Sequence, residues 1–417
     1  MKKIGNMLFY VSIFINVVLI FFGSYIGNLY IIQSIALGLA ILTGKILNMK
    51  IMFDTKMWLA VCTISIISPI FSIDKESSIE IAALILMAVL LKIIYENNVN
   101  NKWQKFFLDL VFICSGIHVF ATIFQLIMPS FIEGINTILL NSEGLQINLE
   151  FYKLGAYAGI TAQTSVNAFY IAIFVGITFF KTLFCKEKKI NIIYIIFIIL
   201  GLIALFITGK RGILITTLIS LIITMFYVSY IDKKNIFKYF LIFSIIGTLG
   251  YFVMINIPAV KVIFDKIEVL NKEENVLNGR DELWKKSIDI FNENPFIGIG
   301  LGSVKNVIGD YSHNIYIQLL AEVGIIGTIL YIIAIICSFC VTMKKVRIIL
   351  KLKDSNDKIT ILISLFLQFI FIIYGFSGNP LFGQFFLLPY IISIAIANSI
   401  KIEKGEEKYE SRNNYLS

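Results

Sequence analysis

Long apolar runs separated by short polar segments occupy most of the chain. A helix needs about 20 apolar residues, at a rise of about 1.5 Å each, to cross a bilayer. Twelve stretches reach or approach that length, namely residues 7–27, 29–47, 57–73, 78–95, 105–128, 156–180, 190–208, 212–231, 236–256, 314–342, 359–377 and 380–399. The pattern therefore predicts an all-α, polytopic transmembrane helical bundle, built as a single integral membrane domain over residues 1–417.

Composition and charge support this class and exclude others. The chain is 58% hydrophobic and only 15% charged, with a mean hydropathy of +0.85, whereas a soluble domain is about a quarter charged. The formal charge of +9 raises the possibility of nucleic-acid binding, but the basic residues form short clusters between apolar runs, as in loops on an anionic membrane face. We therefore expect no nucleic-acid partner.

The distribution of Lys and Arg predicts how the bundle is oriented. With the N-terminus on the cytoplasmic side, 25 of the 36 Lys and Arg residues fall in cytoplasmic segments. Most of the others lie in one long outer loop, to which the positive-inside rule hardly applies. We therefore expect a multi-pass protein of a bacterial cytoplasmic (inner) membrane, with both termini in the cytoplasm.

Two long outer loops are the main polar parts of the chain, at about 129–155 and 257–313. Loops of such length are more often functional than mere connections. The second loop is predicted to contain a short amphipathic helix at about 279–294, which Asn278 can cap and which Pro295 ends.

The apolar face of this predicted helix is formed by Trp284, Ile288 and Phe291, at helical spacing, and Arg280 lies one turn before Trp284 on the same face. The next stretch, FIGIGLGS, reads as a flexible turn. No strand and no βαβ unit surrounds its glycines, so a dinucleotide site is rejected.

Lys210 and Arg211 are two adjacent cations in a short outer connection, FITGKRGILI. Charge is costly near a bilayer, and a helix N-terminus offers free N–H groups to anions, so Arg211 at the start of the next helix suits a phosphate group. The alternative is an ordinary interfacial Arg that extends toward water. Lys153 can add to an anion site, although an ordinary interfacial lysine is the simpler interpretation.

His313 lies where the second outer loop enters the next span, and Ser312 can cap that helix. A helix N-terminus disfavours imidazolium, and a neutral imidazole is what a general base requires. The alternative is a hydrogen-bonded interfacial histidine. Glu322 falls within the span, where a carboxylate needs a partner, and we expect it to support an Arg or Lys. His118, in mid-span, is interpreted as a core histidine.

No serine triad, HExxH motif, P-loop or carboxylate pair is present, and no cysteine spacing indicates a metal site. Few titratable residues fall inside the predicted spans, which counts against a proton-coupled transporter.

The strings GRDELWKKSIDIFNENPFIGIGLGSV and SHNIYIQLLAEVGIIGTILY resemble the Wzy/WaaL superfamily of O-antigen ligases and polysaccharide polymerases, and TGKRGILI resembles its upstream Arg-Gly element. The likeness extends over about residues 155–345. Two departures are Lys210, where the family often has a small residue, and Lys153, where relatives often have Arg. The matching positions are Arg211, Gly212, Arg280, Trp284, Pro295, Gly298, Gly300, Gly302, His313, Asn314, Glu322, Gly324 and Gly327.

The resemblance implies a glycosyltransferase that uses an undecaprenyl-diphosphate-linked oligosaccharide and needs no cofactor or metal. His313 would be the general base or the group that orients the acceptor, with Arg211 and Arg280 neutralising the diphosphate as it leaves. The substrate-binding residues would be Lys210, Lys153, Trp284, Asn314 and Glu322. Membrane lipid, a flippase and a chain-length regulator are the further partners implied.

Several functions remain open. The first choice is a polymerase of repeat units for a capsule, exopolysaccharide or O-antigen. A ligase that moves finished glycan to lipid A core or another acceptor would use the same donor and site. A lipid-glycan flippase or other transporter should show charged residues along a central cavity, and a structural scaffold would leave Arg211, Arg280 and His313 unexplained.

Overall fold

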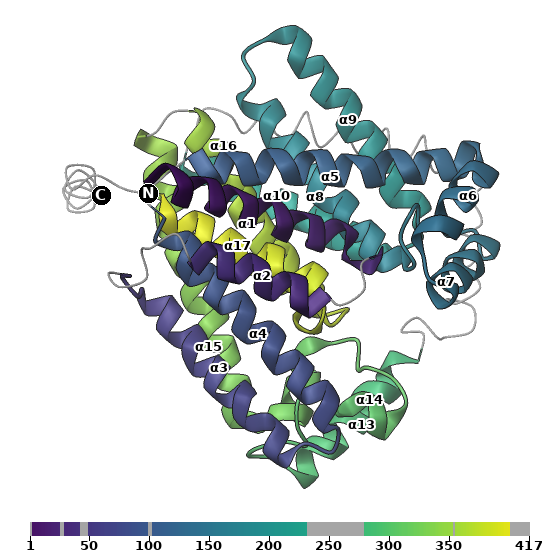
Figure 1. The fold of residues 1–417 in the computed structure, drawn as a ribbon, viewed down its shortest axis with the longest axis vertical. Coiled ribbons are helices and arrows are strands. Elements are labelled where there is room, and N and C mark those ends of the chain that lie inside the picture. Colours follow the sequence, from purple (N-terminus) through teal and green to yellow (C-terminus); the bar gives the residue numbers. More distant parts are fainter. Residues whose placement is uncertain are drawn as a thin grey trace.

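The computed structural model describes residues 2–25, 29–41, 49–98, 102–231, 279–352 and 355–400, and within these ranges it contains helices and no strand (Figure 1). The helices are α1 (Lys2–Phe22), η1 (Gly23–Tyr25), α2 (Leu29–Ile41), α3 (Phe53–Phe71), α4 (Lys75–Glu96), α5 (Lys102–Ile127), α6 (Pro129–Leu139), α7 (Ser142–Lys153), α8 (Thr164–Phe184), α9 (Lys188–Ile207), α10 (Arg211–Ile231), α13 (Arg280–Glu293), α14 (Val304–Ile308), α15 (Ile315–Leu352), α16 (Ser355–Tyr374), η3 (Pro380–Phe382) and α17 (Gln384–Ser399). The predicted all-α polytopic fold is confirmed.

The predicted spans correspond closely to these helices. Nine helices of the described residues are long and apolar enough to cross a membrane, and shorter apolar helices lie at Ile32–Ile41 and Gln384–Ser399. The predicted span at 236–256 lies outside the described residues, as does the predicted capping residue Asn278. The protein is therefore a multi-pass membrane protein.

Helix α8 forms the centre of the bundle and α9 its edge. In their apolar windows, 89% of α8 is buried but only 33% of α9, which lies at the periphery of the bundle (top of Figure 1). His118 of α5 is fully buried against the ring of Tyr170 of α8, and its Nε2 lies 3.1 Å from the carbonyl oxygen of Phe21. The interpretation of His118 as a core histidine is confirmed.

The sixth span begins later than predicted, at Thr164 rather than at residue 156. Side-chain amides of α5 and α7 bond instead to the non-helical backbone before it. Gln125 Oε1 accepts from the Gly159 N–H at 2.7 Å, and Asn148 Nδ2 donates to the Thr161 carbonyl at 2.6 Å. Non-helical backbone at membrane depth needs such partners, and hydropathy alone cannot reveal them.

The glycine turn (residues 295–303) joins α13 to the transmembrane helices. Gly300 donates to the Glu322 carbonyl at 2.8 Å, and α15 is kinked at Gly324, where φ is 63° and ψ is −171°. A Cβ atom on Gly324 would lie 2.3 Å from the Phe296 backbone, and one on Gly300 would lie 2.3 Å from Ser72, between α3 and α4. Gly300 and Gly324 therefore allow the glycine turn, the α3–α4 connection and α15 to pack in direct contact.

An ion cluster, formed by Asp54, Lys92 and Glu96, ties α3 to α4 at the opposite end of the bundle. Lys92 Nζ lies 3.0 Å from Asp54 Oδ2 and 2.8 Å from Glu96 Oε2, and it also donates to Thr55. Lys92 is fully buried within α4, and its assignment to the cytoplasmic side stays a prediction. Asn398 of α17 donates to both carboxylates, at 3.0 and 2.9 Å. Buried charges are stable only with such partners.

Candidate active site

Helix α13 carries Arg280 as its first residue. It spans Arg280–Glu293, with Gly279 at its N-cap and Asn294 at its C-cap, immediately before Pro295. The face that packs inward centres on Ser287 and Ile290, whereas Ile288 is 43% exposed. The predicted apolar face was therefore wrong by part of a turn. Ser287, a polar residue, can lie on the inward face because its hydroxyl donates to the Leu283 carbonyl of the same helix.

The His313 turn (residues 309–314) leads into α15. His313 is the non-glycine residue with a positive φ among the described residues, at 51°. Trp284 Nε1 donates to the Ser312 carbonyl at 2.8 Å, which fixes the backbone immediately before the histidine. Asn314, not Ser312 as predicted, caps α15 by accepting from the N–H groups of Tyr316 and Ile317 at 3.1 and 3.3 Å.

Charged residues from three segments face His313. The imidazole is 39% exposed, and its Nε2 lies 3.6 Å from Asp310 Oδ2. Partial burial lowers the pKa of His313, and the nearby charges of Arg280 and Lys210 lower it further, while Asp310 raises it. The net pKa lies below the ordinary value of about 6.5, so the imidazole is neutral and able to accept a proton at neutral pH.

Lys210 and Arg211 stand at the start of α10, beside the connection between α16 and α17. A Cβ atom on Gly212 would lie 3.1 Å from Ser377 Oγ. The same connection binds the start of α15, because the N–H of Ile315 donates to the Gly375 carbonyl at 2.8 Å. Arg211, at the N-terminus of α10, therefore lies at the same end of the bundle as the His313 turn.

Lys153 is the last residue of α7 and is exposed. Its helix adjoins the cationic segment, since Lys210 Nζ lies 5.0 Å from the centre of the Phe151 ring. Lys153 thus stands at the edge of the group formed by Lys210, Arg280 and His313. Its binding role stays a prediction.

Glu322 is fully buried and holds the glycine turn. Its carboxylate accepts hydrogen bonds from Gly302 N at 2.9 Å, Val304 N at 3.2 Å and Gln318 Nε2 at 3.0 Å, in place of the expected Arg or Lys. Gln318 Oε1 in turn accepts from the Ser312 hydroxyl at 3.1 Å. Glu322, Trp284 and Asn314 therefore support the His313 turn, and their contact with substrate stays a prediction.

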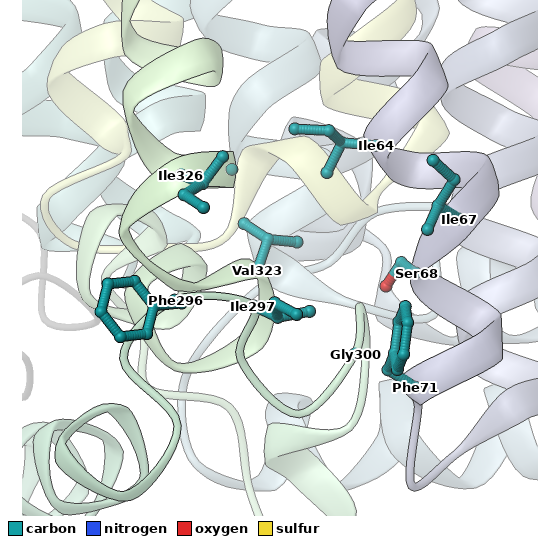
Figure 2. Close-up of a pocket in the computed structure, with 10 residues that line it drawn as sticks. Ile64, Ile67, Ser68, Phe71, Phe296, Ile297, Gly300, Val323 and Ile326 are labelled. Carbon is teal, nitrogen blue, oxygen red and sulfur yellow. The ribbon is translucent and has the colours of Figure 1, made fainter.

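A separate apolar pocket of about 170 Å³ lies between α3 and α15, beside the glycine turn. Figure 2 shows Ile67 and Phe71 on one side, Val323 and Ile326 on the other, and Ile297 and Gly300 between them. No charged residue lines it. A pocket without charged or titratable side chains offers no group for acid–base chemistry, so the His313 turn remains the candidate active site.

Sequence reasoning did not identify Asp310 and Gln318. Asp310 precedes His313 by three residues, a spacing that could have suggested a pair within one turn. Gln318 is one helical turn from Glu322, a spacing that places two side chains on one face. Within the described residues, no group of three His, Cys, Asp or Glu is placed to hold a metal ion.

Comparisons with known proteins bear on the central part of the chain. None of the curated proteins compared with the chain matches it. The region from α9 to α15 contains every predicted site residue except Lys153. Residues 195–332, which begin within α9 and end within α15, match the family model described as O-antigen ligase, as is expected of the Wzy/WaaL superfamily.

Proposed function

We propose that the protein is a membrane glycosyltransferase that polymerises undecaprenyl-diphosphate-linked oligosaccharide repeat units at the outer face of the cytoplasmic membrane. The observation that carries this proposal is the convergence of Arg280 and Lys210, from separate segments of the chain, on the partly exposed imidazole of His313. The match to the O-antigen ligase family over the same residues supports it.

The proposed reaction has one substitution step. A hydroxyl group of the acceptor sugar attacks the anomeric carbon of the donor, its proton passes to His313, and the bond to the lipid diphosphate breaks with its electron pair on the leaving oxygen. Negative charge grows on the diphosphate as that bond lengthens. Cations already in place, such as Arg280 and Arg211, stabilise this charge without reorganisation.

The ion cluster at the other end of the bundle favours an enzyme over a flippase. A flippase needs polar groups that open alternately to either side of the membrane. Asp54, Lys92 and Glu96 instead bond to one another and to Asn398 in a buried arrangement. These bonds hold that end of α3, α4 and α17 together.

Reconstituted protein tests the proposal. The purified chain is supplied with lipid-diphosphate repeat units, and the products are separated by length on a gel. A ladder of longer glycans is expected. We expect His313→Ala to reduce its formation by roughly 10²–10⁴-fold and Arg280→Ala or Arg211→Ala by roughly 10²–10³-fold.

Lys285→Ala is the matched control, because Lys285 is an exposed cation on α13; this variant should polymerise normally. Unchanged ladders from the His313, Arg280 and Arg211 variants would refute the site. Transfer of a preformed glycan to a second acceptor without a ladder would indicate a ligase. Movement of the lipid between leaflets with no new product would indicate a flippase.

A further inference from the structure

Asp310 is the acidic residue that faces His313, and its carboxylate is held by the backbone. Oδ1 accepts from the N–H of Tyr311 at 2.7 Å, while Oδ2 lies 3.6 Å from His313 Nε2. The second distance is that of a loose ion pair, slightly longer than a hydrogen bond. Catalytic pairs are often this loose before substrate binds and tighten afterwards.

The backbone conformation of the His313 turn determines where the imidazole lies. A φ of 51° is uncommon for a residue with a side chain, and it is retained where surrounding bonds enforce it. Trp284 bonds to the carbonyl before His313, and Asn314 caps the helix after it. The turn therefore presents the ring to Asp310 as a consequence of the fold.

The charges around His313 have opposing effects. Arg280 of α13 and Lys210 before α10 both oppose a positive imidazolium, and Asp310 favours one. A general base must be neutral before the reaction and positive after it accepts the proton. Two cations alone would resist the second state, so a carboxylate in contact with the ring is needed to stabilise it.

We propose that Asp310 is a positioning residue for His313. Its carboxylate accepts the Nε2–H of the neutral ring, which leaves Nδ1 to take the proton of the acceptor hydroxyl. Asp310 stays ionised throughout, and the resulting imidazolium is paired with it. This inference rests on the proposed function for the proton transfer, but the ion-pair contact of Asp310 with the ring is already present in the free protein.

Histidine NMR tests the pairing without turnover. The chain has only two histidines, and a His313→Gln sample assigns their signals. In ¹⁵N-histidine-labelled protein, His313 should carry its proton on Nε2 when neutral. Asp310→Asn should lower the pKa of His313, because the carboxylate raises it, and Asp310→Glu should largely restore it. Asp289→Asn, at an exposed position on α13, is the control.

Kinetics give a second readout. Asp310→Asn should lower kcat by roughly tenfold or more, leave the donor KM nearly unchanged, and move the acidic limb of the pH–rate profile to lower pH. An unchanged His313 tautomer and pKa in Asp310→Asn would overturn the inference. A wild-type protein that builds no glycan while its His313 signal responds to Asp310→Asn would refute the proposed function and support the pair.

Discussion

Glu322→Gln distinguishes a buried support from a group that binds substrate. The carboxylate of Glu322 accepts three hydrogen bonds, from Gly302 N, Val304 N and Gln318 Nε2. Glutamine has the same size but one acceptor oxygen, so its NH₂ group must face at least one of these buried donors. An unsatisfied buried donor costs about 1–3 kcal/mol, and we expect a loss of that size in the free energy of unfolding.

The assay combines stability and kinetics. Thermal unfolding of Glu322→Gln in detergent is compared with that of wild type and of Glu293→Gln, an exposed glutamate at the end of α13. Turnover should fall because the glycine turn and His313 turn loosen, while the donor KM stays within about twofold. The opposite result, wild-type stability with a KM raised tenfold or more, would mean that Glu322 meets the substrate and that its assigned role is wrong.

Four other substitutions test separate contacts. Lys92→Met should destabilise the protein by about 3–5 kcal/mol, because two buried carboxylates lose their cation; an unchanged melting temperature would argue against the cluster. Trp284→Phe removes a bond to the carbonyl before His313 and should cost about 1 kcal/mol together with a larger loss of turnover; full activity would contradict this role. Gly300→Ala places a Cβ atom 2.3 Å from the α3–α4 connection, so we expect poor folding yield, and normal yield would show that the turn can move. Arg280→Gln removes a cation that lowers the pKa of His313, so the acidic limb of the pH–rate profile should move to higher pH, and a shift to lower pH would exclude their interaction.

Features encoded locally could be predicted from the sequence. Membrane spans are continuous apolar runs, and α13 differs by one residue at each end from the predicted 279–294, since Pro295 is a local signal for its end. Arg280, Lys210 and His313 were identified because each is a charged or titratable residue in an outer connection. The pattern of apolar runs alone gives no reason for such a residue there.

Features that depend on distant partners could not be predicted. Glu322 was expected to pair with a cation, but its partners are backbone N–H groups about 20 residues earlier. Lys92 looked like a loop cation because its partner Asp54 lies on another helix. Asp54 in turn accepts a hydrogen bond from Asn398, 344 residues away. No periodicity links such positions.

The same separation has a consequence for how the protein is made. Synthesis proceeds from the N-terminus, so α3 and α4 exist long before α17. Until α17 arrives, the carboxylates of Asp54 and Glu96 lack the amide of Asn398, one of their bonding partners. Helix α17 is therefore required to complete a bond network begun by α3. A chain truncated before Gln384 would leave the buried carboxylates without the Asn398 amide and should be degraded more readily than the full chain.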